Sequence, residues 1–234
     1  MTAGSSIAAT IPAYQAEPYL GDVVRRTLAV LPDLLVVDDG STDATAEAAR
    51  RAGARVIRHA RNRGKGTALQ TAFNDLFARG FDAVITLDAD GQHLPEQIPE
   101  LIDAYREGAD LVIGSRERLF ADFHPIRRTS NRCSSYLISA AAGQTFADIQ
   151  CGFRIYTRRL IQATGFAEPR FEAESAVVVR AVRLGFMVVA VPVRLGFADG
   201  RHTSHYRPVV DSCRIAGAVT RARLEALGWA TRRS

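Results

Sequence analysis

Two aspartates stand one residue apart directly after a short apolar run. Asp88 and Asp90 follow the segment AVIT at residues 83–86, within LDADGQH. Two carboxylates this close repel each other unless a positive charge lies between them. Mg²⁺ and Mn²⁺ take one or two carboxylates and complete their coordination with water and substrate phosphate. The pair is consistent with a metal and phosphate site, although an isolated D-x-D is more often part of a solvated turn.

A second pair of aspartates ends another apolar run. Asp38 and Asp39 close the segment LLVVDD at residues 34–39 and are followed by GSTD. A carboxylate at this place can accept hydrogen bonds from N–H groups of uracil or guanine, or from ribose hydroxyls. The Asp-Gly-Ser-Thr sequence is also ordinary turn chemistry leading into a helix. We expect Asp39 to contact a ligand and Thr42 to cap the following helix.

A glycine-rich basic segment, RNRGKGTAL, occupies residues 61–69. A P-loop NTPase is excluded, because the Walker A motif needs an earlier glycine where His59 and Ala60 stand, and Ser or Thr where Gly66 follows Lys65. What remains is a basic turn at a helix N-terminus, where backbone N–H groups and Lys65 can contact an anion. Close packing at the start of the helix explains the glycines equally well.

These residues must be positioned by regular elements, and the chain alternates short apolar runs with longer segments of helical periodicity. The expected strands are Ile7 to Ile11, Leu34 to Val37, Arg55 to Ile57, Ala83 to Leu87 and Leu111 to Ile113. The expected helices between them are Glu17 to Val30, Asp43 to Ala52, Gly66 to Ala78 and Pro95 to Glu107. Repeated strand–helix–strand units predict an α/β fold with a mostly parallel sheet and helices on both faces.

After Gly114 the chain changes character. Residues 116–135 are rich in arginine and polar side chains; beyond them we expect helices at Tyr136 to Ala142 and Phe171 to Leu184, a strand at Val188 to Val193 and a basic C-terminal helix. In open α/β sheets the ligand lies beyond the carboxyl ends of the strands. Tyr14 and both aspartate pairs follow predicted strands, so we expect them to meet at one site.

Charge and cysteine content narrow the class of protein. The 234 residues include 30 Lys and Arg against 25 Asp and Glu, and Lys65 is the single lysine. A general arginine bias explains part of this excess, and the rest favours an anionic partner such as phosphate, a nucleotide or an acidic membrane surface. The three cysteines form no C-x-x-C pair, which argues against a disulfide framework or a zinc site and fits a reducing cytoplasm.

No segment has the pattern of a signal peptide or a membrane span. The N-terminus lacks a basic region, and the most apolar later stretch, Ala176 to Val193, is interrupted by Arg180 and Arg183. We expect one soluble domain over residues 1–206. A basic amphipathic helix over residues 207–234 would pack on that domain or lie at a membrane surface.

Six motifs follow one another along the chain. They are PAY at 12–14, VDDGSTD at 37–43, NRGKG at 62–66, DADGQH at 88–93, GSR at 114–116 and DIQCGFR at 148–154. Together they resemble the family 2 glycosyltransferases of GT-A fold, a single Rossmann-like domain. Within that family the sequence looks most like the dolichyl-phosphate mannose synthase and polyprenyl-phosphate glycosyltransferase branch. The resemblance extends from about Ile7 to Val193.

For the donor, the resemblance implies a nucleotide-sugar pocket and a divalent cation, Mg²⁺ or Mn²⁺. The pocket would be lined by Pro12, Tyr14, Asp39, Lys65, Asp88 and Arg201. Asp90 and Gln92 would hold the cation on the donor diphosphate, with Asp88 touching the nucleotide or the metal. Arg201 falls, with Ser204 and Arg207, where the family has a basic loop that closes over the donor phosphates.

For the acceptor, the resemblance points to the arginine-rich middle of the chain. An acceptor phosphate would be met by Arg116, Arg128, Ser130 and Arg132, and the catalytic residues would be Asp148, Asp90 and Arg116. Asp148 and Gln150 precede a turn that approaches the reacting sugar in the family, and Glu174 matches an acidic position on the following helix. Two departures from the branch, Gly91 where leucine is common and the lack of C-terminal membrane helices in this sequence, keep a hydroxyl acceptor open.

The expected function is inverting, metal-dependent transfer of a sugar from GDP-mannose or a UDP-hexose to a polyprenyl phosphate, in the cytoplasm and peripherally at the membrane. A phosphate acceptor is already anionic, whereas a hydroxyl of a cell-envelope glycan or glycolipid would need Asp148 or Glu174 as a base. A non-catalytic nucleotide-sugar binding protein is the other alternative. We expect no nucleic-acid partner, and a homo-oligomer stays open.

Overall fold

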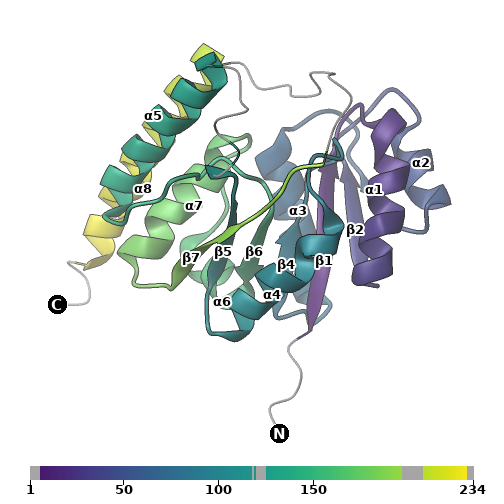
Figure 1. Cartoon of the computed structure of the whole chain (residues 1–234), viewed down its shortest axis with the longest axis horizontal. Coiled ribbons are helices and arrows are strands. Elements are labelled where there is room, and N and C mark those ends of the chain that lie inside the picture. The colour runs from purple at the N-terminus through teal and green to yellow at the C-terminus, as the bar shows by residue number, and fades with distance from the viewer. Residues whose placement is uncertain (1–5, 118, 120–124, 197–207, 231–234) are drawn as a thin grey trace, which may run out of the picture.

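The computed structural model describes residues 6–117, 119, 125–196 and 208–230 of the chain (Figure 1). Within them lies a seven-stranded sheet in the order β3-β2-β1-β4-β6-β5-β7. The strands are β1 (Ile7–Ala13), β2 (Leu34–Asp38), β3 (Arg55–Arg58), β4 (Ala83–Thr86), β5 (Leu111–Ser115), β6 (Arg154–Thr157) and β7 (Val188–Pro192). β6 is antiparallel to β4 and β5, whereas the other neighbouring pairs are parallel. The expected α/β fold with a mostly parallel sheet is confirmed.

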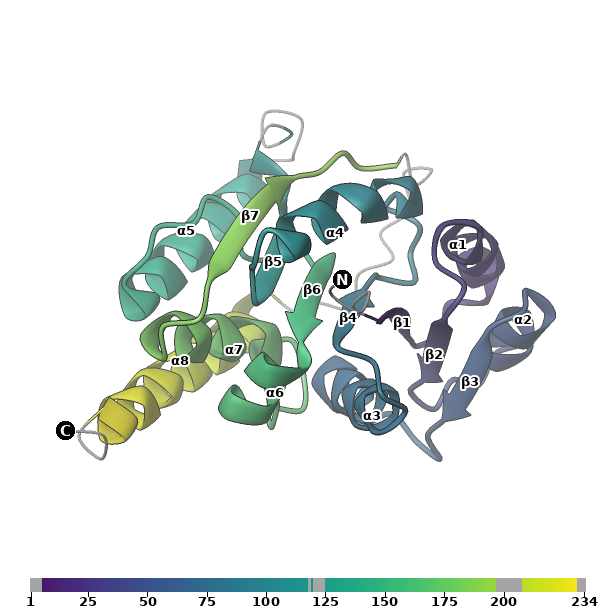
Figure 2. The same ribbon diagram turned by 90° about the horizontal axis from the view of Figure 1, so that it is seen from below.

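Helices cover both faces of this sheet (Figures 1 and 2). They are α1 (Glu17–Val30), α2 (Thr45–Arg51), α3 (Lys65–Ala78), α4 (Ile98–Arg106) preceded by the 3-10 turn η1 (Pro95–Gln97), α5 (Pro125–Ala142), α6 (Arg158–Thr164), α7 (Glu172–Arg183) and α8 (Pro208–Ala230). Side chains from α3, α5, α7 and α8 form one core with the sheet, and those from α1 and α4 form the other. The sheet is therefore the middle layer of three.

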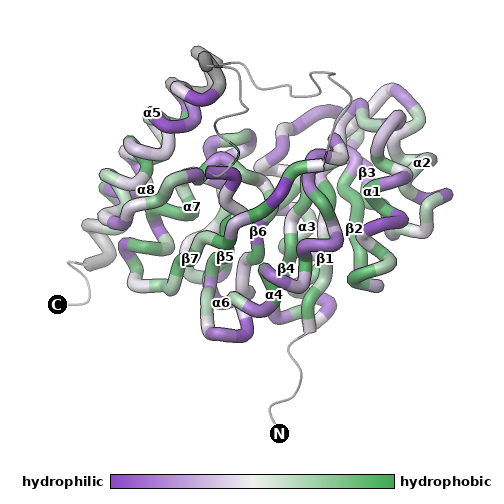
Figure 3. Tube along the Cα trace, in the orientation of Figure 1, coloured by the Kyte–Doolittle hydropathy of each residue, from purple (hydrophilic) through white to green (hydrophobic). Residues whose placement is uncertain are grey.

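The strands are apolar because side chains on both of their faces are buried. Leu35 and Val37 of β2 belong to one core, and Val36 between them belongs to the other. Successive side chains of a strand point to opposite faces, so a strand covered on both sides needs a continuous apolar run rather than alternation. Figure 3 shows hydrophobic residues concentrated in the central strands.

The sequence prediction missed β6 and α6. β6 is only four residues long and begins with Arg154, whose charge hides the apolar pattern of a buried strand. Its side chain is 1% exposed, and every residue of the strand is buried. The following helix α6 starts directly after β6, with the Thr157 hydroxyl accepting a hydrogen bond from the Leu160 N–H at 3.3 Å. α5 is also longer than predicted, beginning at Pro125.

The C-terminal helix α8 packs along α7 and beside α5. Its buried side chains, Ile215, Ala218, Val219, Ala222 and Ala226, are spaced three or four residues apart, and the first four join the α3–α5–α7 core. Glu225 of α8 lies 3.0 Å from the Arg180 guanidinium of α7. None of the helices in the described residues is both long and apolar enough to cross a membrane.

Candidate active site

The loops after β1, β2 and β4 meet at one edge of the sheet. Pro12 of β1 is paired with Val37 of β2, and the Asp39 N–H donates to the Ala13 carbonyl at 2.8 Å. β4 runs parallel to β1 on its other side and leads to Asp88. Because parallel strands end at the same edge, segments that are far apart in sequence converge there. The half-buried Tyr14 follows β1 at this edge.

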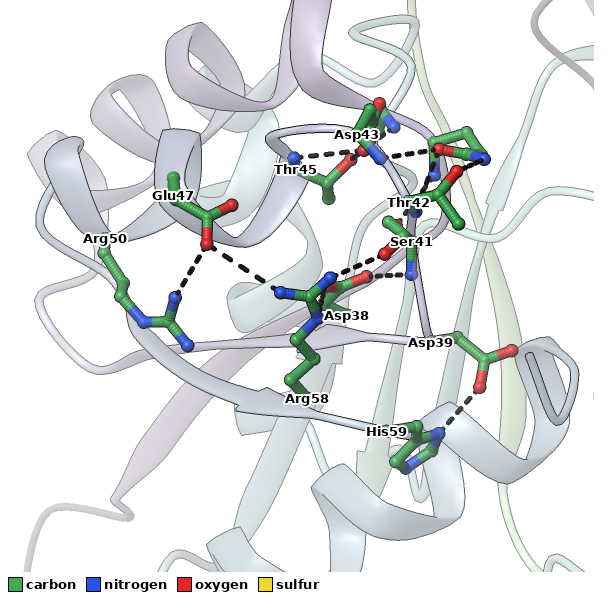
Figure 4. A network of polar contacts seen from close by, with 12 residues as sticks. Asp38, Asp39, Ser41, Thr42, Asp43, Thr45, Glu47, Arg50, Arg58 and His59 are labelled. Atoms are coloured by element: carbon green, nitrogen blue, oxygen red, sulfur yellow. Dashed lines mark hydrogen bonds and ion pairs between the residues drawn. The ribbon is translucent and has the colours of Figure 1, made fainter. Parts of the chain in front are cut away.

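The turn after β2 is held by a network that extends to α2 and β3 (Figure 4). Asp38 is fully buried, its Oδ1 accepts from the Ser41 N–H at 2.9 Å, and its Oδ2 lies 3.1 Å from Arg58 Nε. Arg58 also donates to the Ser41 carbonyl at 2.6 Å and lies 3.8 Å from Glu47 of α2. Asp38 therefore stabilises the turn through these buried contacts.

The predicted cap of the following helix is wrong. α2 begins at Thr45, and the residue before it, Ala44, offers no capping side chain. Asp43 takes this role instead, because its carboxylate accepts from the Thr45 N–H at 3.1 Å. Thr42 accepts from the side-chain amide of Gln15 at 2.8 Å, which ties the β2 turn to the loop after β1.

Asp39 anchors the basic turn before α3. It is 3% exposed, and its carboxylate accepts from the backbone N–H groups of Arg63 at 2.9 Å and Gly64 at 2.7 Å. His59 Nδ1 lies 2.6 Å from Asp39 Oδ1, and His59 Nε2 lies 3.0 Å from the Thr71 hydroxyl on α3. Gly64 has φ +98°, and a Cβ there would lie 2.4 Å from the Pro169 carbonyl oxygen. The turn is thus fixed from both sides.

Lys65 extends from the first residue of α3 into a pair of carboxylates. Its Nζ lies 2.7 Å from Asp88 Oδ1 and 2.9 Å from Glu174 Oε2. Burial alone would lower the pKa of Lys65 by disfavouring its charged form. The two carboxylates have the larger effect and raise the pKa of Lys65. In the same way burial opposes the ionised form of Asp88, and Lys65 nevertheless holds its pKa well below the usual range. Lys65 and Asp88 therefore stabilise each other in their charged forms.

His93 is a buried histidine that contacts the backbone of Asp88. Its Nδ1 accepts the Asp88 backbone N–H at 3.0 Å, its ring stacks on Phe153 with 5.4 Å between centroids, and Cys151 Sγ lies 3.5 Å from Nε2. Burial lowers the pKa of His93 to about 4 and raises the pKa of the Cys151 thiol to about 11. His93 is therefore a neutral imidazole, and because Nδ1 accepts, the proton resides on Nε2.

Asp90 and Gln92 form a tight turn after Asp88. The Gln92 N–H donates to Asp90 Oδ1 at 3.0 Å, and both residues are half-buried. Gly91 between them has φ +75°, a conformation that glycine adopts without strain. No group of three or more His, Cys, Asp or Glu side chains placed to hold a metal occurs in the described residues. One carboxylate and one amide oxygen nevertheless fit Mg²⁺ or Mn²⁺, which take few protein ligands.

Arg116 and Asp148 form a buried bidentate ion pair. Arg116 Nε lies 2.8 Å from Asp148 Oδ2 and Nη2 lies 3.1 Å from Oδ1, while the Arg116 backbone N–H also donates to Oδ2 at 3.0 Å. Asp148 is fully buried. Burial alone would raise the pKa of Asp148, but the hydrogen bonds and charge of Arg116 hold it below its usual range. The pair joins the end of β5 to the DIQCGFR segment.

Arg154, the last residue of that motif, positions the segment, a role that the sequence alone did not assign to it. Its guanidinium donates to the carbonyls of Cys151 at 2.7 Å and Glu174 at 2.6 Å, and also to the Ile149 carbonyl. The Thr86 hydroxyl of β4 donates to the Gly152 carbonyl at 2.6 Å. The sequence does show an arginine at the end of the DIQCGFR motif. Its three carbonyl partners, however, are brought to it only by tertiary folding.

Gly152 lies against the Lys65 and Asp88 cluster. A Cβ at this position would be 2.7 Å from Lys65 Nζ and 2.7 Å from Asp88 Oδ2. Two further polar atoms near this loop are buried without a hydrogen-bond partner among the described residues, namely Gln150 Nε2 and Glu174 Oε1. An unpaired buried polar atom is costly, and it is commonly found where a ligand binds.

The remaining predicted residues lie farther along the chain. On α5, Arg128 is half-buried and Arg132 is exposed. The side chain of Ser130 is not among the described parts of the structure. The other three predicted residues, Arg201, Ser204 and Arg207, lie outside the described residues. The structure thus brings together Pro12, Tyr14, Asp39, Lys65, Asp88, Asp90 and Gln92 at one edge of the sheet, and Arg116 with Asp148 near them.

The fold and this edge define an α/β protein with a polar site beyond the carboxyl ends of its strands. The fold is shared with glucosyl-3-phosphoglycerate synthase from Mycobacterium tuberculosis, solved in complex with Mn²⁺, UDP-glucose and phosphoglyceric acid. The match has a TM-score of 0.73 at 20% sequence identity and covers 94% of this chain and 80% of that chain. The GT-A fold expected from the sequence is confirmed.

Sequence comparison identifies the family. Residues 9–165 match the family described as Glycosyl transferase family 2, and the chain belongs to that family. It is 35% identical over 169 residues to an undecaprenyl-phosphate 4-deoxy-4-formamido-L-arabinose transferase of Edwardsiella ictaluri, covering 67% of this chain and 50% of the relative. It is 32% identical over 196 residues to an undecaprenyl-phosphate mannosyltransferase of Micrococcus luteus, covering 78% and 80%. The chain thus spans about half the length of the first of these relatives.

Proposed function

We propose that this chain transfers a sugar from a nucleotide-sugar donor to a polyprenyl phosphate. The observation that carries the proposal is the convergence of Asp39, Lys65, Asp88 and Asp90 at the carboxyl edge of the sheet. Lys65 supplies a cation for a diphosphate and Asp90 a carboxylate for a divalent metal, while Asp39 holds the basic turn that precedes Lys65. The names of the relatives, two of which act on undecaprenyl phosphate, support the acceptor class.

The donor would lie with its diphosphate near Asp90 and Gln92. These residues would hold Mg²⁺ or Mn²⁺, which when bound neutralises the negative charge of the departing diphosphate. Asp88 has another task in this proposal, because Lys65 already provides its counter-charge at 2.7 Å. Asp88 and Glu174 would keep Lys65 in place, and the unpaired Gln150 Nε2 and Glu174 Oε1 would be available to sugar hydroxyls. Attack from the face opposite the diphosphate would invert the anomeric centre.

The ion pairs favour a phosphate acceptor over a hydroxyl. A hydroxyl needs a base, and Asp148 and Glu174 are the two carboxylates that the sequence offers for that task. Asp148 is fully buried in a bidentate pair with Arg116, which keeps its pKa low, and Glu174 is paired with Lys65. Asp148 held in this way is a weak base, and Glu174 already has Lys65 as its partner. A phosphate that is already anionic would be positioned by arginine and would need no proton removed.

A transfer assay with purified protein tests this function. A panel of nucleotide sugars would be supplied with Mg²⁺ or Mn²⁺, with and without a short-chain polyprenyl phosphate. The expected result is release of a single nucleoside diphosphate that depends on the lipid phosphate, with the sugar recovered on the lipid. Nucleotide binding without lipid-dependent turnover would contradict the acceptor and favour a hydroxyl. The proposal also places the protein in the cytoplasm, working at the cytoplasmic face of the membrane.

A further inference from the structure

One face of α5 presents apolar and basic side chains to the outside of the molecule. The exposed residues are Thr129, Arg132, Cys133, Tyr136, Leu137 and Ala140, which recur every three or four positions and so form one stripe. The side chains of Tyr136 and Leu137 are 74% and 53% exposed, respectively, and these two are adjacent. Neighbouring exposed large hydrophobic residues on a surface helix generally indicate an interaction site.

The opposite face of the same helix is fixed to the active-site loop. The Ser135 hydroxyl accepts the Ile149 N–H at 3.2 Å, and the Ser139 hydroxyl accepts the Phe146 N–H at 3.0 Å. Ile138 lies in the core beside these serines. The rotation of α5 about its axis is therefore set by contacts with the segment that carries Asp148. Tyr136 and Leu137 are held facing outward rather than left there by a loosely packed helix.

We propose that this stripe docks on an anionic membrane surface. The sequence of α5, PIRRTSNRCSSYLISAAA, contains no acidic residue, and Arg132 is the arginine on the stripe. A second copy of the chain packed on the stripe about a two-fold axis would offer Arg132 no carboxylate of α5 as a partner. An anionic lipid surface instead complements Arg132 and accepts the tyrosine and leucine side chains at its interface.

The position of α5 suits this role. The helix begins at the edge of the molecule toward which the parallel strands run (Figure 1). It follows Arg116 in the sequence and contacts the loop after Asp148 through Ser135. A protein resting on the membrane through α5 would have the Arg116 and Asp148 pair on the other side of that helix, about 10 Å from the lipid surface. In this respect the inference rests on the proposed lipid-phosphate acceptor, and it names the surface that would bring the site to that acceptor.

Cosedimentation of the full chain with lipid vesicles tests the proposal without any donor or acceptor. Vesicles of phosphatidylcholine alone are compared with vesicles that also contain phosphatidylglycerol. We expect binding to the anionic vesicles, and a loss of about tenfold or more in the double variant Tyr136→Ser, Leu137→Ser, because two apolar side chains leave the interface. Arg132→Gln should weaken binding about fivefold on anionic vesicles and leave the weak binding to neutral ones unchanged.

Met187→Ser is the matched control, since Met187 is 50% exposed but precedes β7 rather than lying on α5. It should bind as the unchanged protein does. The double variant should also retain its circular dichroism spectrum and, if the proposed function holds, full transfer to a water-soluble short-chain polyprenyl phosphate. Failure of the transfer assay alone would refute the proposed function and leave the vesicle result standing.

Three results would overturn the inference. First, the unchanged protein could fail to bind anionic vesicles. Second, the α5 variants could bind as well as the unchanged protein, which would show that another surface contacts the membrane. A dimer in solution that the double variant dissociates would assign the stripe to a second copy of the chain. Light scattering of the same samples distinguishes this last case.

Discussion

The Nζ atom of Lys65 lies 2.7 Å from Oδ1 of Asp88, so the first aspartate of the D-x-D sequence has its counter-charge inside the protein. The repulsion expected between Asp88 and Asp90 is relieved on one side by this lysine, the single lysine of the chain. The two aspartates therefore differ in role. Asp88 belongs to an ion cluster with Lys65 and Glu174, and Asp90 lies at the turn where a cation on a diphosphate would be held.

Lys65→Met should destabilise the fold by about 1–3 kcal/mol, because it leaves the buried carboxylate of Glu174 and the half-buried carboxylate of Asp88 without their partner. Urea unfolding at neutral pH measures the effect. Arg106→Met is the control, since Arg106 forms an exposed pair with Asp103 and should change stability by less than about 1 kcal/mol. A Lys65→Met protein as stable as the control would show that the cluster relaxes or admits water.

Gly152→Ala should weaken donor binding about tenfold while the protein stays folded. The added Cβ would lie 2.7 Å from Lys65 Nζ and Asp88 Oδ2, which are ends of side chains that can shift at a cost of about 1–3 kcal/mol. Calorimetric titration with a nucleoside diphosphate and Mn²⁺ measures the affinity. Gly217→Ala on α8, where a Cβ meets nothing within 4 Å, should leave affinity unchanged. Equal affinities in both variants would contradict a donor site at this cluster.

His93 should make stability depend on pH between about 6.5 and 4. Burial lowers its folded-state pKa to about 4, so between these values the unfolded chain binds a proton that the folded protein excludes. Stability therefore falls as the pH falls through this window, by a total on the order of 3 kcal/mol.

Unfolding curves of the unchanged protein and of His93→Asn measure this effect. Asparagine retains an acceptor for the Asp88 N–H but cannot titrate in this range, so the slope between pH 6.5 and 4 should largely disappear. The depressed pKa values of Asp88 and Asp148 affect stability from about pH 5 downward, so the comparison between the two proteins is most direct between about pH 6.5 and 5. A slope that persists in His93→Asn would assign it to other groups.

Asp90→Ala should reduce transfer by about 10²–10³-fold, because the charge on the departing diphosphate would lose its bound cation. Stability should change little, since the side chain is half-buried at a turn. Turnover is compared across a range of Mn²⁺ concentrations, with Asp103→Ala on the exposed face of α4 as the control. Full activity of Asp90→Ala in the presence of a chelator would remove the metal from the proposed mechanism.

Local patterns in the sequence were sufficient for most of the architecture. The alternation of apolar runs with helical periodicity identified the parallel strands and the helices between them, because a sheet buried on both faces requires those runs. Polar residues at the ends of β1, β2 and β4 indicated that these side chains would meet, since parallel strands end at one edge. The family resemblance carried by the six motifs was confirmed by comparison with known proteins.

The partners within the site were decided by tertiary structure. Lys65 meets Glu174 because α7 packs beside the start of α3, and Arg116 meets Asp148 because β6 returns antiparallel between β4 and β5. This strand, β6, begins with Arg154, and the charged residue interrupts the apolar pattern by which a buried strand is recognised in a sequence. Residue types and spacing along the chain determined which side chains could do chemistry. Long-range docking of helices and strands determined which charges are paired, because an ion pair depends on distance in space and leaves no periodic trace in the sequence.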